Sequence, residues 1–492
     1  MNTEIVVIGL DIGTTGIKGL IVDDKGKIIK KEEEKLELIS PHPGWAEQNP
    51  TDWWNGTINV LRRLVNYAKS QNFVVKAIAT SGQMHSLVIL DKSGNVLHNA
   101  ILWCDQRTDT ECFEIMNELG GQRKTIEILG NPVLPGFTAG KIRWLKKNVP
   151  DVFEKMSKVM LPKDYINYML TGQIKTEHSD ASGTAMYDIG KKEWSQEVLD
   201  VLEIKVDILP QIVESNGLVG KLREELKNEF GLSEDVLVFA GGADNACAAL
   251  GIGVTKPDVG MISLGTSGTV LVPTEGNTPD LEGKVHLFSH VVKNTNYYMG
   301  VMLSATHTLN WFNELLGNEK YDIINDEISN VPIGARGIIV LPYLNGERTP
   351  HNDPYARGVV FGLSTSHSKW DLYRAVYESV AFGLKDCYDA LLEKNVSQLR
   401  ITGGGSNSDI WVKIISDVFG EKITLVNSKE GAAYGAAMLA YSGLTEKPVE
   451  QIADNWVSVT KTVVPEKGNT EIYTEVIEKY RKIYRTLKEL FR

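Results

Sequence analysis

The sequence has few cysteines, no long apolar run and no excess of basic residues. Its 492 residues include four cysteines, which are neither closely paired nor spaced like zinc ligands: Cys104, Cys112, Cys247 and Cys387. This pattern argues against a disulfide framework and a zinc site, so we expect a reduced protein. No apolar run reaches the roughly 20 residues that a membrane-spanning helix needs. Because residues 1–5 also lack the basic start of a secretory signal, a cytoplasmic location is predicted.

The charge balance narrows the possible partners. Lysine and arginine number 52 against 63 aspartate and glutamate residues, which gives a formal net charge of −11. We expect no general affinity for nucleic acid or anionic membranes, so local donors must hold any bound phosphate. The chain is too long for one compact core, and two domains are predicted, residues 1–253 and 254–492. A homodimer is the default expectation for a soluble enzyme.

A glycine-rich stretch near the start, residues 9–18, is the strongest local signal. Apolar, β-branched residues flank it on both sides, which predicts a strand, a tight turn and a second strand. Gly13 and Gly16 permit the positive φ angles of such a turn. The exposed backbone N–H groups, with the hydroxyls of Thr14 and Thr15, would form a concavity suited to phosphate oxygens. The alternative interpretation is an ordinary β-hairpin.

Asp11 lies on the first of these strands, just before the turn. Two anions at close range repel, so its carboxylate cannot face a phosphate without a cation between them, and Mg²⁺ is the usual one. Asp11 is therefore the predicted metal-holding residue. Lys18, at the end of the same stretch, is predicted with Thr14 and Thr15 to bind the nucleotide.

A second hairpin of the same kind appears about half the chain later, at residues 260–271. An apolar strand again leads into a Gly-Thr-Ser-Gly turn and out into another apolar strand. Two such hairpins suggest an internal duplication that clamps one polyphosphate between two lobes. The predicted phosphate-binding residues of this second turn are Gly265, Thr266 and Ser267. The arrangement resembles the actin-like ATPase fold, in which each of two lobes contributes a phosphate hairpin.

A helix is predicted directly after the proline-bounded loop that ends at Pro50, with Thr51 as its N-cap. Five apolar residues recur at helical spacing and predict one buried face: Trp54, Ile58, Leu61, Val65 and Ala68.

Met84 and His85 follow a predicted buried strand that begins at residue 74. Loops at the carboxyl ends of strands in layered α/β folds are where ligands bind. His85 is therefore either a ligand contact or a hydrogen-bonded structural residue.

Asp244 and Asn245 follow another apolar strand and a double glycine, at the start of a helix rich in small residues. Asp is favoured at helix N-termini, where it caps free N–H groups and opposes the dipole, so capping is one interpretation of Asp244. The other is that this carboxylate, at a junction between lobes, contacts a substrate hydroxyl.

A run of three glycines, residues 403–405, separates a predicted strand at 398–402 from a helix at 410–419. Such a run lets backbone approach a flat ligand closely, as an adenine ring requires. The alternative is a tight turn between strand and helix. On the first interpretation, Gly404, Gly405 and Ser408 border the adenosine.

The ordered set of motifs is similar to the FGGY family of carbohydrate kinases, over nearly the whole chain. Residues 136–148 fit one family signature and residues 358–378 fit the other, with these matching positions: Thr138, Lys141, Trp144, Asp371, Leu372, Ala375 and Glu378. Agreement of several parts in order is more specific than a single glycine motif. Residues 82–85, 161–165 and 346–352 point within the family to a kinase of D-xylulose.

The resemblance implies an α/β protein of two actin-like (ribonuclease H-like) domains with the active site in the cleft between them. It also implies ATP and Mg²⁺ as cofactors and a small sugar as partner, phosphorylated at its terminal C5 hydroxyl. Asp244 would be the catalytic base, and Asp11 would help to hold metal and phosphates. Met84, His85 and Asn245 would contact the sugar.

Two alternatives stay open at this point. One is a kinase of the same family that acts on ribulose, gluconate or glycerol. Ser86 and Ala243 stand where such D-xylulose kinases commonly have glycine, and both lie near the sugar-contact positions. The other is a non-catalytic actin-like nucleotide switch, which would not need the Met84–His85 and Asp244–Asn245 pairs.

Overall fold

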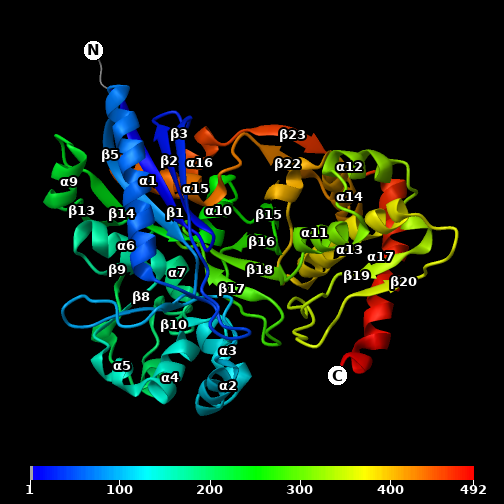
Figure 1. Ribbon diagram of the computed structural model, residues 1–492, viewed down its shortest axis with the longest axis horizontal. Coiled ribbons are helices and arrows are strands. Elements are labelled where there is room, and N and C mark those ends of the chain that lie inside the picture. Colours follow the sequence, from blue (N-terminus) through cyan, green and yellow to red (C-terminus); the bar gives the residue numbers. More distant parts are fainter. Residues whose placement is uncertain (1–3) are drawn as a thin grey trace.

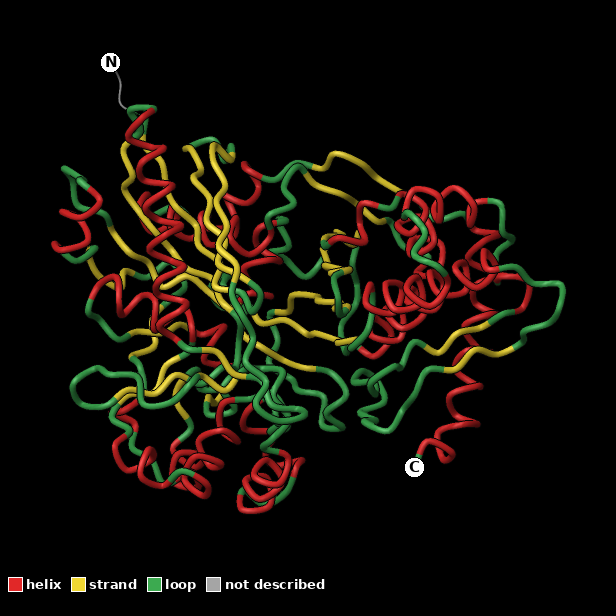
Figure 2. Tube along the Cα trace, in the orientation of Figure 1, coloured by secondary structure: helices red, strands yellow, loops and turns green. Residues whose placement is uncertain are grey.

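Two mixed β-sheets form the framework of the computed structural model, which describes residues 4–492 (Figures 1 and 2). The first sheet has the strand order β13-β14-β5-β1-β2-β3. Its strands are β1 (Ile5–Ile12), β2 (Gly16–Asp23), β3 (Ile28–Lys35), β5 (Val74–Gly82), β13 (Leu218–Lys221) and β14 (Leu237–Ala243). β1, β5 and β14 run parallel, so their carboxyl ends meet at one edge of the sheet.

The second sheet has the order β17-β18-β16-β15-β21-β22-β23. Its strands are β15 (Val259–Leu264), β16 (Gly268–Thr274), β17 (His286–Ser289), β18 (Asn296–Met302), β21 (Gln398–Thr402), β22 (Ile423–Val426) and β23 (Val459–Val463). β15 and β16 form an antiparallel hairpin, as β1 and β2 do, and β21 and β22 continue the sheet in parallel. The two sheets therefore repeat one pattern, as the paired glycine hairpins predict.

Helices cover both sheets (Figure 2). Those of the first half are α1 (Pro50–Ser70), α2 (Asp109–Glu118), α3 (Gln122–Leu129), α4 (Thr138–Asn148), α5 (Pro150–Lys155), α6 (Pro162–Thr171), α7 (His178–Ser182), α8 (Gln196–Leu202), α9 (Glu224–Phe230) and α10 (Asp244–Gly251). Those of the second half are α11 (Thr306–Leu316), α12 (Tyr321–Ser329), α13 (Lys369–Ala390), α14 (Asp409–Phe419), α15 (Gly431–Thr445), α16 (Val449–Trp456) and α17 (Lys467–Leu487).

Helix α15 lies against the first sheet although it comes from the last part of the chain (Figure 1). A Cβ atom on Gly9 of β1 would come within 2.0 Å of the Ala433 carbonyl oxygen, so only glycine permits this approach. α15 also packs on α10, where a Cβ atom on Gly435 would come within 2.0 Å of the Cys247 oxygen. One buried cluster includes these helices and side chains of both sheets, so the two halves share a core.

The boundary predicted between residues 253 and 254 falls in the loop between α10 and β15. It stays a prediction, because α15 contacts the first sheet across that division.

The start of helix α1 corrects one prediction. The N-cap is Asn49, whose side chain accepts a hydrogen bond from Thr51 N (2.9 Å), and Pro50 takes the first helical position. Proline is favoured there because its missing N–H would be unsatisfied in any case. Thr51 is therefore not the cap. The register also makes Trp53 the fully buried tryptophan, whereas Trp54 is half-buried.

The four cysteines are free thiols, three of them buried. Among residues 4–492, no helix is both long and apolar enough to cross a bilayer.

Candidate active site

Asp11 and Asp244 meet at the carboxyl edge of the first sheet. In the strand register Asp11 lies beside Ser81 of β5, and Ser81 lies beside Gly242 of β14, two residues before Asp244. The two carboxyl groups are close enough that the charge of Asp11 raises the pKa of Asp244. The sheet thus brings together two residues that are 233 positions apart in the sequence.

Strand β14 carries an irregularity just before Asp244. Its pairing with β5 shifts register between Phe239 and Gly242, and Gly241 has a φ angle of +78°. A Cβ atom on Gly241 would lie 1.6 Å from the Thr80 carbonyl oxygen, so no other residue fits. Bulges of this kind redirect the residues that follow them. Here the bulge sets the direction in which the chain leaves the sheet and starts α10 at Asp244.

The Asp244 carboxylate is half-buried and bonded only to its neighbour. Its Oδ1 accepts hydrogen bonds from Asn245 N (2.7 Å) and Asn245 Nδ2 (3.0 Å). Burial, with the charge of Asp11 second, raises the pKa of Asp244 to about 7. The N-cap position of α10 is occupied by Ala243, which has no side-chain cap. Asp244 therefore takes the first helical position instead of the N-cap position, and its carboxylate accepts from the first-turn N–H of Asn245. Its role as a catalytic base stays a prediction.

The Asp11 side chain suits a divalent cation. Its buried Oδ1 has no hydrogen-bond partner, and burial raises its pKa against the opposing charge of Lys18. Because the charge of Asp11 raises the pKa of Asp244, a cation between the two carboxyl groups would favour their ionised forms. Among residues 4–492 no cluster of three or more His, Cys, Asp or Glu side chains could hold a metal alone. A Mg²⁺ ion at Asp11 would therefore take its other ligands from water and phosphate oxygens, as Mg²⁺ usually does.

Lys18 lies opposite Asp11 on β2, but its ammonium group already has anionic neighbours. It pairs with Glu430 (3.1 Å) and Glu33 (3.7 Å). Its predicted contact with the nucleotide stays a prediction, since a phosphate would have to compete with these carboxylates.

Each glycine turn is closed by a backbone hydrogen bond from the N–H of its first glycine, which spans three residues in the first turn and two in the second. Gly13 N donates to Gly16 O (3.0 Å), and Gly265 N donates to Ser267 O (3.1 Å). The Thr14 hydroxyl accepts from the Trp103 indole N–H (2.9 Å), while Thr15 and Thr266 are exposed at their turns. The Gly265 carbonyl accepts from Thr306 N at the start of α11.

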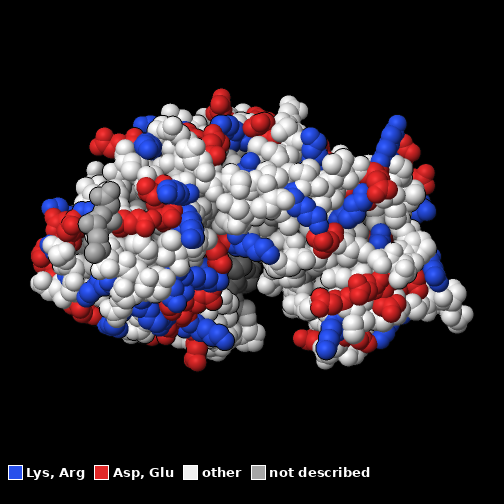
Figure 3. Space-filling model, turned by 90° about the horizontal axis from the view of Figure 1, so that it is seen from above, with Lys and Arg blue, Asp and Glu red and all other residues white. Residues whose placement is uncertain are grey.

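A cavity of about 200 Å³ contains Asp244 and residues of both halves of the chain. Figure 3 shows the surface hollowed between the two lobes. The residues that line the cavity are Met84, His85, Trp103, Leu134, Gly136, Phe137, Asp244, Asn245, Ser263, Ser267, Thr269, Met299, Val301 and Arg348. The four predicted sugar-contact residues are thus together, with Ser267 of the second hairpin beside them.

The His85 ring is held in one orientation and one tautomer. Its Nδ1 contacts the Gly183 carbonyl, which can only accept, so Nδ1 carries the proton and Nε2 is left as an acceptor. The ring stacks on Phe137 at 4.4 Å, and burial lowers the pKa of His85 to about 3. His85 has a φ angle of +66°. A neutral acceptor of this kind suits a sugar hydroxyl.

Two residues of the first family signature hold the His85 backbone in place. Lys141 Nζ donates to the His85 carbonyl (2.8 Å) and to the Gly136 carbonyl (2.7 Å), and Thr138 Oγ1 donates to the same His85 oxygen (3.0 Å). Lys141 and Thr138 therefore act by positioning the His85 loop.

A separate cavity of about 420 Å³ lies on the second lobe, next to the glycine run. Gly404, Gly405 and Ser408 all line it, and their contact with the adenosine stays a prediction. A Cβ atom added to Gly404 would have no other atom within 4 Å, so the backbone at this position is open to a ligand. Asn325 Oδ1 accepts from Ser408 Oγ (2.8 Å) and Tyr377 OH (3.0 Å), which leaves the Asn325 N–H₂ group for a bound base.

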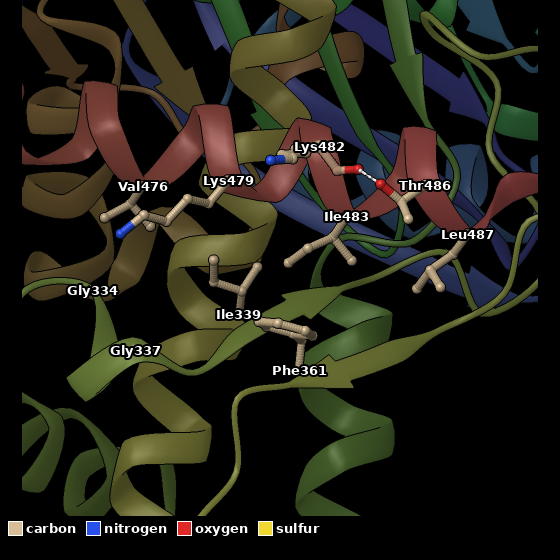
Figure 4. Close-up of a pocket in the computed structure, with 10 residues that line it drawn as sticks. All are labelled: Gly334, Gly337, Ile339, Phe361, Val476, Lys479, Lys482, Ile483, Thr486 and Leu487. Atoms are coloured by element: carbon tan, nitrogen blue, oxygen red, sulfur yellow. Dashed lines mark hydrogen bonds between the residues drawn. The ribbon is translucent and has the colours of Figure 1, made fainter.

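A third cavity, of about 510 Å³, lies between α17 and the hairpin of β19 (Ile339–Leu341) and β20 (Val359–Phe361) (Figure 4). Its lining is mostly apolar, with Lys479 and Lys482 on α17. It contains no carboxylate, so it lacks the general base of the Asp244 cavity.

Nine residues that line the Asp244 cavity are absent from the predicted set, among them Trp103, Phe137 and Arg348. Phe137 has a local signal, because it directly precedes Thr138 of the family signature. Trp103 links the sugar side of the site to the first hairpin through its bond to Thr14, and no local pattern marks it.

Comparisons with known proteins agree with this geometry. Residues 6–251 match the family model for "FGGY family of carbohydrate kinases, N-terminal domain". Residues 260–444 match the model for the C-terminal domain of the same family. The chain belongs to the FGGY family of carbohydrate kinases. The predicted family and the predicted actin-like fold are therefore confirmed, and a kinase of this family uses ATP.

Relatives of this FGGY kinase match along almost their whole length. Xylulose kinase of Bacillus subtilis (strain 168) is 38% identical over 489 residues, which cover 98% of this chain and 97% of the relative. A crystal structure of a xyloylose kinase from Brucella ovis superposes with a TM-score of 0.93 at 35% identity, covering 99% of this chain and 100% of that one. A gluconate kinase from Lactobacillus acidophilus superposes with a TM-score of 0.91 at 26% identity, covering 99% and 98%.

Proposed function

We propose that this FGGY kinase transfers the γ-phosphoryl group of ATP to the C5 hydroxyl of D-xylulose. The observation that carries the proposal is Asp244, a half-buried carboxylate with a pKa raised to about 7, in one cavity with His85, Asn245 and the second phosphate hairpin. The xylulose kinases at 34–38% identity over nearly the full chain support this sugar. The sugar cavity also argues against a non-catalytic nucleotide switch.

In the proposed reaction Asp244 orients the attacking hydroxyl and takes its proton. Phosphoryl transfer passes through a loose transition state, so the protein mainly positions the reactants and neutralises charge. A base with a pKa near the working pH is efficient in this role, because it is ionised and still accepts a proton readily. His85 Nε2 accepts a hydrogen bond from another sugar hydroxyl, and Asn245 holds the Asp244 carboxylate in place.

Bound nucleotide lies between the two hairpins in this proposal. The turns at Thr14–Thr15 and Gly265–Ser267 hold phosphates, and Gly404, Gly405 and Ser408 border the adenosine. Mg²⁺ at Asp11 would supply positive charge to the phosphates. The division into domains at 253/254, a homodimer and a cytoplasmic location belong to the same proposal.

A second candidate is phosphorylation of a sugar acid such as gluconate. The gluconate kinase from Lactobacillus acidophilus has the same fold at 26% identity, and Arg348 places a positive charge in the cavity.

A coupled kinase assay over a panel of ketoses, polyols and gluconate tests both candidates. We expect D-xylulose to give the highest kcat/KM and to stimulate ATP consumption strongly. A preference for gluconate would favour the second candidate, and ATP consumption that no sugar stimulates would refute both.

A further inference from the structure

We propose that Arg348 is a specificity-determining residue that binds the non-reacting end of the ketose, its C1 hydroxyl and C2 carbonyl oxygens. This inference rests on the proposed function. Arg348 comes from the second half of the chain, whereas the predicted sugar contacts all come from the first.

The guanidinium of Arg348 lies at the His85 end of the cavity. Arg348 lines the cavity with His85 and Asp244. Its positive charge contributes to the lowered pKa values of His85 and of His286, which lies in β17. The neighbouring charge that shifts the pKa of Asp244 is instead that of Asp11. A sugar with its reacting hydroxyl at Asp244 would therefore extend its other end toward Arg348.

The guanidinium of Arg348 has free N–H donors. Within the part of the chain that the structure describes, no hydrogen bond or ion pair engages the guanidinium of Arg348. The backbone N of Arg348 donates to Glu347 Oε1 (2.8 Å). That Glu347 oxygen also accepts from Leu303 N (2.9 Å), so the carboxylate serves the backbone. Burial lowers the pKa of Arg348, and the neighbouring charge of Glu347 opposes this shift without cancelling it.

By contrast, Arg107 and Arg374, whose side chains are buried, each pair with a carboxylate. Arg107 pairs with Glu47 (2.8 Å) and Asp105 (2.7 Å), and Arg374 donates to Glu378 (2.7 Å) with a further bond to a tyrosine hydroxyl. A guanidinium has five N–H donors and no acceptor, so what Arg348 lacks is an oxygen acceptor. A bound ketose supplies one in its carbonyl group.

The backbone beside Arg348 is fixed on its C-terminal side. Thr349 N donates to Val301 O (3.0 Å), and Val301 N donates back to Thr349 Oγ1 (3.0 Å). The Thr349 hydroxyl also donates to the Lys284 carbonyl (2.9 Å). Glu347 and Asp353 exchange two backbone hydrogen bonds across the same loop. The loop therefore presents Arg348 to the cavity from a rigid base, which is what discrimination between similar sugars requires.

The test crosses variants with substrate analogues. Purified wild-type enzyme, Arg348→Met and Arg348→Lys are assayed with D-xylulose, with its 1-deoxy analogue and with the pentitols that lack the carbonyl. We expect Arg348→Met to lower kcat/KM for D-xylulose about 10- to 100-fold, mainly through KM for the sugar, because a hydrogen bond to a charged group is lost. KM for ATP should stay within about twofold.

The decisive result is whether the effect of the Arg348 substitution depends on which substrate is used. If Arg348 binds the C1–C2 end, an analogue that lacks the contacted oxygen already loses that contact, so Arg348→Met should cause little further loss with at least one analogue. Arg357→Met is the matched control, since Arg357 is exposed on the same loop and bonds only to backbone carbonyls. Its kinetics should equal those of wild type.

Three outcomes would overturn the inference. The first is an equal loss in Arg348→Met for every substrate. The second is wild-type kinetics in both Arg348 variants with D-xylulose. The third is a wild-type enzyme that does not accept D-xylulose, which refutes the proposed function as well and is seen before any variant is made. If Arg348→Met fails to fold, Arg348→Lys, which keeps the charge, is judged by the same cycle.

Discussion

Replacement of Asp244 by asparagine tests the proposed base most directly. Asparagine keeps the shape and can still hydrogen-bond a sugar hydroxyl, but it cannot accept the proton. General-base catalysis contributes roughly 10²–10⁴-fold, so kcat should fall by about that factor while sugar and ATP binding stay within a few-fold. The assay is kcat with D-xylulose, measured beside the melting temperature.

The pH dependence of kcat/KM tests the same prediction in a second way. Burial and Asp11 raise the pKa of Asp244 from 3.8 to about 7, so its base form is lost as pH falls through 7. We expect wild-type kcat/KM to fall about tenfold per pH unit below that point, with this acid limb absent from the residual activity of Asp244→Asn.

As pH rises, ionisation of Asp244 should raise the activity of the enzyme and lower the stability of its fold. A carboxyl group whose pKa is raised on folding binds its proton more tightly in the folded state, so its ionisation destabilises the fold as pH rises from the unfolded value through 7. The rise from 3.8 to about 7 sets an upper limit of about 4 kcal/mol, which solvent at this half-buried site reduces. Asp244→Asn should therefore melt no lower than wild type at pH 8. Near-normal turnover in a folded variant would remove Asp244 from the mechanism.

Three further predictions concern the sugar loop, the cleft and the bulge. His85→Ala should raise KM for the sugar far more than KM for ATP, because a hydrogen bond to an uncharged hydroxyl contributes about 0.5–1.5 kcal/mol; unchanged constants would leave His85 a structural residue. Sugar with a non-hydrolysable ATP analogue should reduce the radius of gyration in X-ray scattering, since both hairpins reach one triphosphate only in a closed cleft; an identical curve at saturation would argue against closure. Gly241→Ala should lower the melting temperature strongly, because its Cβ would lie 1.6 Å from the Thr80 oxygen, whereas Gly468→Ala, with no atom within 4 Å, should not; equal melting temperatures would show that the bulge relaxes.

The parts of the site that could be predicted are those that a short stretch of sequence encodes. The two glycine turns, the strand ends at Met84–His85 and Asp244, and the run at Gly404–Gly405 each combine a strand pattern with residues of special backbone freedom. Strand β21 begins and ends where its apolar pattern predicts.

The parts that could not be predicted depend on contacts between distant segments. Arg348 reaches the cavity only because its loop is tied to Val301 of β18, and Lys18 meets Glu430 more than 400 residues later. The cap of α1 was misplaced for a local reason: Thr51 and Asn49 both favour caps, and Pro50 between them decides for Asn49.

The position of α15 has a consequence for how the protein is made. The face of the first sheet that contains Gly9 is covered by residues 431–445, which a ribosome adds after nearly nine-tenths of the 492-residue chain. Until then, β1, β5 and β14 expose an apolar surface that nothing else in the first half covers in the same way. Such a surface promotes aggregation of a nascent chain. A fragment that ends at residue 253 should therefore be poorly soluble alone, and a separately supplied second half that contains α15 should restore its solubility.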